Sequence, residues 1–134
     1  MRVGGKIVAE PRQSFEERIN EIDEASMEYY NRLHSRFLSY KGVKSRLSLR
    51  CDSYRAGKKL LAKITIGGNS LKIYLDIDAS QEDIAQKKIR FRDMSKASAY
   101  KEVPAMIPIK SELCARKVCD IIDIMMAQKG FEKV

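Results

Sequence analysis

Apolar side chains recur at spacings of three and four residues through the first third of the chain, which predicts helix from Ser14 onward. Ser14 and Glu17 fit a capping box at the start of this segment. Asp23 is placed to begin a second helix after a break, and Gly42 followed by an apolar residue predicts the end. The predicted buried stripe consists of Phe15, Ile19, Ile22, Ser26, Tyr30, Leu33, Phe37 and Tyr40.

The middle of the chain changes to the two-residue alternation of β-strands, over 46–54, 59–66 and 71–77. Turns at 55–58 and 67–70 join these segments into a predicted antiparallel meander. A slip of one residue would move every apolar side chain to the other face, so the register is well specified. With Gly68-Asn69 and Ala56-Gly57 at the turn centres, the inward pairs are Ile66–Leu71, Ile64–Ile73, Ala62–Leu75 and Leu60–Ile77, with Leu47, Leu49, Cys51 and Ser53 on the same face.

This register also predicts which side chains lie on the opposite face of the meander. Three cross-strand rows follow, namely Arg50–Lys63–Tyr74, Asp52–Leu61–Asp76 and Tyr54–Lys59–Asp78. Asp78 opposite Lys59 predicts a cross-strand ion pair, and Asp52, Arg55 and Lys59 could form an ion network that holds the first turn. One end of this face is therefore expected to be basic.

The remaining segments complete a fold of the α+β class. Residues 88–94 alternate as a fourth strand, and 105–110 predict a fifth strand at a sheet edge, because Pro108 cannot donate to a ladder. Ser111 caps a last helix that Gly130 closes, with Cys114, Val118, Ile121, Ile122 and Met125 as its buried stripe. We expect an antiparallel meander of four to five strands, with the N- and C-terminal helices packed on one face. Residues 1–13 are interpreted as a tail or linker and 14–134 as a single domain.

Composition agrees with one globular domain and excludes several classes of protein. The 134 residues are 44% hydrophobic and 33% charged, with a formal net charge of +8. Apolar runs are too short to span a bilayer and no secretory leader is recognisable, so we expect a cytoplasmic protein without membrane insertion. The three cysteines lack metal-ligand spacing, and we interpret them as small core residues without a disulfide framework or zinc.

Catalytic signals are weak in this sequence. His34 is the single histidine and lies mid-helix, where a structural role is the simpler interpretation, and no phosphate-binding glycine motif occurs. Asp76 and Asp78 alternate on one strand, but an ion pair explains them more simply than acid–base chemistry. We therefore expect no enzyme activity, no metal and no cofactor.

Charge is distributed unevenly along the chain. Segment 31–117 carries 20 basic and 8 acidic residues, whereas six of the seven charged residues between Ser14 and Glu28 are acidic. The first hypothesis is a binding module whose basic sheet face contacts an anionic partner, either a nucleic acid or an acidic protein, through Arg46, Arg50, Lys63, Lys72 and Tyr74. The alternative is a protein–protein or homodimer module that uses the acidic helix, with Glu16, Glu17, Glu21, Glu24 and Glu28 as its contacts.

The central block carries a family resemblance over 39–78, which reads SYKGVKSRLSLRCDSYRAGKKLLAKITIGGNSLKIYLDID. With Ser14-Phe15, Tyr29-Tyr30 and Val103-Pro104, it resembles a family of uncharacterised bacterial domains common in Gram-positive species. The likeness covers roughly 14–129, and departs from the family at Lys58-Lys59 and at Leu49, where Trp is frequent. It implies a module rather than a self-contained enzyme. A more distant likeness, to YdhG-like or frataxin-like α+β domains, implies an iron chaperone with an acidic iron-binding surface.

Overall fold

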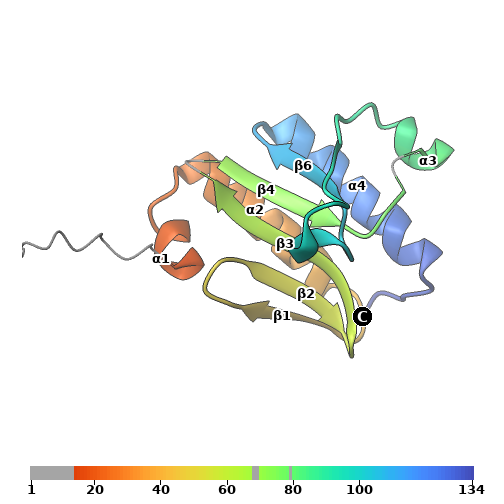
Figure 1. Ribbon diagram of the computed structural model, residues 1–134, viewed down its shortest axis with the longest axis horizontal. Helices are drawn as coiled ribbons and strands as arrows, with labels where there is room; N and C mark the ends of the chain where they lie inside the picture. Colours follow the sequence, from red (N-terminus) through yellow and green to blue (C-terminus); the bar gives the residue numbers. More distant parts are fainter. Residues whose placement is uncertain (1–13, 68–69, 79) are drawn as a thin grey trace, which may run out of the picture.

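The computed structural model describes residues 14–67, 70–78 and 80–134, so the predicted tail at 1–13 and the turn centre at 68–69 lie outside the described residues. The described part of the chain starts with two helices and continues through a sheet, and its last element is a long helix (Figure 1). In order, the elements are α1 (Phe15–Ile19), α2 (Glu24–Leu38), β1 (Val43–Leu47), β2 (Asp52–Ala56), β3 (Lys59–Gly67), β4 (Ser70–Leu75), α3 (Glu82–Ala85), β5 (Arg92–Asp93), the 3-10 turn η1 (Ser98–Tyr100), β6 (Ala105–Ile109) and α4 (Glu112–Gln128).

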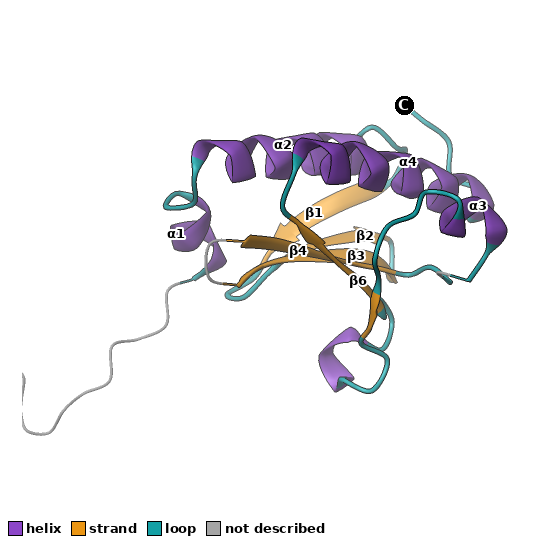
Figure 2. Cartoon of the chain, turned by 90° about the horizontal axis from the view of Figure 1, so that it is seen from above, coloured by secondary structure: helices purple, strands orange, loops and turns teal. Residues whose placement is uncertain are grey.

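The described strands form one antiparallel sheet in the order β1-β2-β3-β4-β6-β5. Helices α2 and α4 lie side by side on one face of the sheet, and η1 lies on the opposite face (Figure 2). The α+β class is confirmed, with six strands rather than four to five. We call the side covered by α2 and α4 the helix side, and the opposite side the outer face.

Local sequence signals set the helix ends as expected. Ser14 and Glu17 form the capping box of α1, while the Asp23 and Ser111 side chains accept the N-cap hydrogen bonds of α2 and α4. Gly42 and Gly130 follow the ends of α2 and α4 with φ values of 80° and 82°, a conformation that glycine adopts without strain. The break at Asp23 turns α2 onto the sheet.

The register of β3 and β4 is confirmed at the centre of the sheet. Ile64 lies opposite Ile73 on the helix side, and Lys63 lies opposite Tyr74 on the outer face. The expected Leu60–Ile77 pair is wrong, because β4 ends at Leu75 and β3 carries a β-bulge against β2. The bulge places Leu61 in the main core and turns Leu60 to the outer face.

The predicted strand over 46–54 is wrong, because it is two strands joined by a tight turn. Ser48 closes this turn: its N–H donates to the Cys51 carbonyl at 2.8 Å and its hydroxyl donates to the same oxygen at 3.0 Å. Ser53, not Arg50, therefore lies opposite Lys63, and the row Arg50–Lys63–Tyr74 does not exist. Asp52 and Tyr54, expected on the outer face, are fully buried on the helix side.

The segment before β6 also differs from the expectation. Only Arg92–Asp93 of the predicted strand 88–94 is a strand, and β6 lies between β4 and β5 rather than at the edge. Because β5 pairs only with Ala105 and Met106, the rest of that side of β6 has no strand partner among the described residues, which accommodates Pro108. Residues 94–104 fold back over part of the outer face, where Leu60, Tyr74, Val103 and Met106 form a second, smaller core.

The cysteines are all free, but they do not share one environment. Cys119 is buried in the main core and Cys114 is half-buried against it. Cys51 is not a core residue, because it lies in the β1–β2 turn with its sulfur 3.3 Å from the Ser48 hydroxyl. No helix within the described ranges is both long and apolar enough to cross a bilayer.

Candidate functional site

Basic side chains occupy adjacent positions on the outer face of β1, β2 and β3. Lys44 lies directly opposite Arg55, and the next row runs Arg46, Ser53, Lys63. Like charges directly opposite each other in a sheet destabilise it. Neighbouring strands are about 4.8 Å apart, so these rows concentrate positive charge within a small area.

These outer-face cations lack the ion pairs that the helix side has. Among residues 14–67, 70–78 and 80–134, no carboxylate pairs with Lys44, Arg46 or Arg55, nor with Arg50 or Lys72. By contrast, the α2–α4 layer is cross-linked by its charges. Arg32–Glu112 and Arg36–Asp123 join α2 to α4. Arg116–Glu112 lies within α4, and Lys87–Asp120 and Lys133–Asp123 join α4 to the segments that follow α3 and α4.

Lys72 extends the basic surface toward the β3–β4 hairpin. It lies opposite Thr65 on β3 and Pro108 on β6. Its side chain passes over Gly67, where a Cβ atom would come within 3.2 Å of the ammonium nitrogen. Glycine at this position therefore leaves room for the lysine to lie along the sheet.

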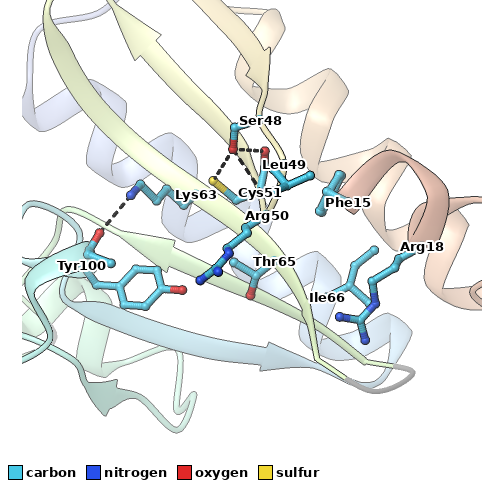
Figure 3. Close-up of a pocket in the computed structure, with 11 residues that line it drawn as sticks. Phe15, Arg18, Ser48, Leu49, Arg50, Cys51, Lys63, Thr65, Ile66 and Tyr100 are labelled. Carbon is cyan, nitrogen blue, oxygen red and sulfur yellow. Dashed lines mark hydrogen bonds between the residues drawn. The ribbon is translucent and has the colours of Figure 1, made fainter. Parts of the chain in front are cut away.

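A groove of about 790 Å³ opens beside these cations (Figure 3). The β1–β2 turn forms one wall and η1 the other, with β3 as the floor and α1 at one end. Among the described residues that line it, three are basic and none is acidic. The lining consists of Phe15, Arg18, Ser48, Leu49, Arg50, Cys51, Lys63, Thr65, Ile66, Ala99 and Tyr100.

Hydrogen bonds hold the two walls of the groove in place. The Phe15 N–H donates to the Leu49 carbonyl at 2.7 Å, which fixes the β1–β2 turn to α1. Across the groove, the Lys63 ammonium donates to the Ala99 carbonyl at 2.9 Å and lies 5.6 Å from the centre of the Tyr100 ring. Since the acceptor is neutral, this bond positions the lysine without neutralising its charge.

Two stacked tyrosines form the η1 side of the site. The Tyr74 and Tyr100 rings are 3.9 Å apart and almost parallel. Tyr74 is only 5% exposed, so it supports Tyr100 from beneath, and of these two rings it is Tyr100 that lines the groove. Burial, with a hydrogen bond to Tyr74, raises the pKa of Tyr100 to about 12, so its hydroxyl is neutral at physiological pH.

The structure places the predicted basic residues at different parts of this surface. Arg46, Lys63 and Lys72 are on the outer face, whereas Arg50 projects from the β1–β2 turn into the groove. Two residues that line the groove, Arg18 and Tyr100, are not among the site residues predicted from the sequence. Arg18 lies in a mostly acidic segment and Tyr100 in a segment without periodicity, so neither pattern indicates a site. The predicted network of Asp52, Arg55 and Lys59 is wrong, because Asp52 lies on the opposite side of the sheet from Arg55 and Lys59 pairs with Asp76 at 3.0 Å.

The buried Asp52 is the centre of a polar cluster beneath α2. Its carboxylate accepts hydrogen bonds from the hydroxyls of Tyr30 and Tyr54, both at 2.7 Å, and from Ser45 at 2.5 Å. His34 lies 2.9 Å from the Tyr54 hydroxyl and 3.4 Å from Asp52. Burial, together with the Asp52 charge, raises the pKa of Tyr30 and of Tyr54 above the usual value. This cluster fastens α2 to β2, and it gives His34 the structural environment that the sequence predicts.

The other carboxylates are divided between capping, pairing and open surface. Asp78 accepts from Ser80 and does not pair with Lys59, so the expected cross-strand pair is wrong. Within the described ranges, no group of three His, Cys, Asp or Glu side chains is arranged to hold a metal ion. The five candidate glutamates, Glu16, Glu17, Glu21, Glu24 and Glu28, are all exposed on α1, α2 and the turn between them.

Comparisons with protein-family models, with curated proteins and with solved structures found no match for this chain. The resemblance carried by the 39–78 block therefore stays a prediction.

Proposed function

We propose that this protein is a non-catalytic binding module that holds single-stranded nucleic acid on the outer face of its sheet. The observation that carries this proposal is the Lys44–Arg55 pair, two like charges directly opposite each other with no described carboxylate to answer them. Phosphates on the outer face would relieve this repulsion. Free cysteines suit a reducing compartment, so the proposal places the module in the cytoplasm.

Nucleic acid is favoured over an acidic protein by the groove beside the basic rows. The groove combines cations with the Tyr100 ring, and single-strand binding surfaces use this combination of phosphate contacts and base stacking. Duplex is a poorer fit because its bases are stacked inside the helix and cannot reach an aromatic side chain.

The test is fluorescence anisotropy with a labelled single-stranded oligonucleotide over a series of salt concentrations. We expect log affinity to fall linearly with log salt, with a slope of about −0.7 for each phosphate neutralised. Arg46→Gln with Arg55→Gln should weaken binding and flatten that slope. The matched control, Arg116→Gln with Lys117→Gln, removes the same charge from α4 and should leave both unchanged.

Two outcomes would contradict the proposal. Absence of binding by the unmodified protein at physiological salt would end the nucleic-acid assignment. Binding to polyglutamate but not to the oligonucleotide would indicate an acidic protein as the partner instead.

The second candidate is a homodimer in which the acidic α1–α2 corner of one copy meets the basic outer face of another. It is favoured by the exposure of all five glutamates on the same chain that carries the basic rows. Light scattering without any ligand would detect the dimer, and Glu24→Lys with Glu28→Lys should convert it to monomer. A monomer at every protein concentration and at low salt would exclude this candidate.

A further inference from the structure

The groove differs from the flat part of the outer face in shape as well as in charge. Its volume of about 790 Å³ lies within the range of about 300–1,000 Å³ that is usual for small-ligand sites. A phosphate backbone alone needs only exposed cations such as Lys44 and Arg46. The shape of the groove therefore fits a ligand that carries negative charge and also has a compact group that the groove can enclose.

Side chains that can bind a phosphate group lie at the middle of the groove. Arg50 extends from the β1–β2 turn toward the space between Tyr100 and Thr65 (Figure 3). Lys63 comes from the floor and is held by the neutral Ala99 carbonyl, so its full charge remains available. The Thr65 hydroxyl also lines the groove and can donate to a phosphate oxygen.

Apolar surface is supplied by both walls. Leu49 is 65% exposed on one wall, and Tyr100, backed by Tyr74, presents an aromatic side chain on the other. A flat ring held between them would bury apolar area while its attached phosphate reaches Arg50 and Lys63. Aromatic and apolar walls with a few convergent polar groups are the usual composition of such sites.

We propose that the groove is a binding site for one nucleotide unit, with the phosphate at Arg50 and Lys63 and the base between Leu49 and Tyr100. The unit could come from a free nucleotide or from one position of a single strand, because the chemistry is the same. This inference rests on the proposed function in its single-strand form, and it adds that the groove encloses one nucleotide unit, with the base between Leu49 and Tyr100.

Cys51 provides a reporter for groove occupancy, since its half-exposed thiol lines the groove while Cys119 is buried. The rate at which Cys51 reacts with a thiol reagent is measured by mass spectrometry, with half-buried Cys114 as the internal control. Three probes are compared: a single-stranded oligothymidylate, an abasic strand of the same length, and free thymidine 5′-monophosphate. Anisotropy gives the affinities of the two strands at one salt concentration.

We expect oligothymidylate to bind about tenfold more tightly than the abasic strand, because stacking of one base is worth about that factor. It should slow modification of Cys51 and leave Cys114 unaffected. Leu49→Ser changes an exposed side chain and should remove most of the preference for bases without unfolding the protein. Arg50→Gln should weaken both strands, and Tyr100→Leu should act like Leu49→Ser.

The outcomes separate the two proposals. Protection of Cys51 by free thymidine 5′-monophosphate supports the site with a free nucleotide as the source, and protection by oligothymidylate alone supports it with a strand as the source. Equal affinity for the two strands, with Cys51 still reactive in both complexes, would overturn the nucleotide site and leave the proposed function standing. Failure of every probe to bind would overturn both.

Discussion

Asp52 and Arg55 lie three residues apart on β2, yet they point to opposite sides of the sheet and into opposite electrostatic situations. Asp52 is completely buried, and three hydroxyl groups donate to its carboxylate. Arg55 lies on the outer face beside another cation, with no described carboxylate in contact. The comparison teaches that charge on the helix side serves stability, because it is compensated within the fold, whereas the outer-face charge has no compensating carboxylate among the described residues.

The largest expected effect is on the helix side, at Asp52. Asp52→Ala removes the acceptor of the buried Tyr54 hydroxyl and of the half-buried Tyr30 and Ser45 hydroxyls, and each buried group left unsatisfied costs about 1–3 kcal/mol. We expect the free energy of unfolding to fall by about 3 kcal/mol in urea denaturation followed by circular dichroism. Asp83→Ala, an exposed control, should cost less than about 0.5 kcal/mol. A loss below about 1 kcal/mol at Asp52 would mean that the cluster is not a structural unit.

A second test follows from the raised pKa of Tyr54. Its folded pKa lies well above the unfolded value near 10, so its contribution is complete below pH 10 and is lost as the pH rises beyond it. Each such group makes stability fall by about 1.4 kcal/mol per pH unit in that window. The free energy of unfolding should therefore fall less steeply above pH 10 in Tyr54→Phe than in the unmodified protein. Parallel pH profiles would contradict the raised pKa that burial and the Asp52 charge give Tyr54.

A smaller effect is expected at Asp76, which accepts from Lys129 at 2.8 Å and pairs with Lys59 at 3.0 Å. Burial alone would raise the pKa of Asp76, but the two lysines outweigh it and hold the pKa below its usual value. This stabilisation is present above about pH 4 and is lost as the pH falls through the folded pKa. Asp76→Asn should cost about 1 kcal/mol at pH 7, and this difference should shrink toward pH 2. A difference that is constant with pH would exclude the ion pairs as its cause.

The smallest effect on stability is expected on the outer face. Arg55→Gln removes one of the two like charges in the Lys44–Arg55 pair, so stability should stay within about 0.5 kcal/mol or rise slightly. The gain should be larger at low ionic strength, because salt screens exposed charges. Thermal melts at low and high salt would measure this. A clear loss of stability would show that Arg55 is compensated within the fold and would weaken the comparison.

The sequence predicts the centre of this fold better than its margins. Strict alternation on both sides of a short turn sets the pairing of Ile64 with Ile73, and the capping residues Ser14, Asp23 and Ser111 act locally. The sequence does not predict the β1–β2 hairpin, because L-S-L-R-C alternates like a continuous strand. The hydrogen bonds of Ser48 reverse the chain there instead. That error exchanged the faces of Asp52 and Tyr54.

The groove could be predicted only in part. Arg50 and Lys63 were chosen for their charge, and both line the groove, but through the β1–β2 turn rather than through a shared row. Tyr100 lies in a segment without periodicity, so nothing in its own sequence indicates that this segment folds back over the outer face and stacks Tyr100 on Tyr74. Long-range packing of this kind is not encoded in a local pattern.

The place of β6 in the sheet has a consequence for how the chain folds. Strands β1 to β4 are joined by short turns, whereas residues 76–104 separate β4 from β6, and α4 follows only after β6. Closing a longer loop costs more entropy, so the β1–β4 meander should form first and present its apolar face before α4 arrives to cover it. A folding intermediate of this kind would show early hydrogen-exchange protection at β3 and β4, and it would be the species most prone to aggregate.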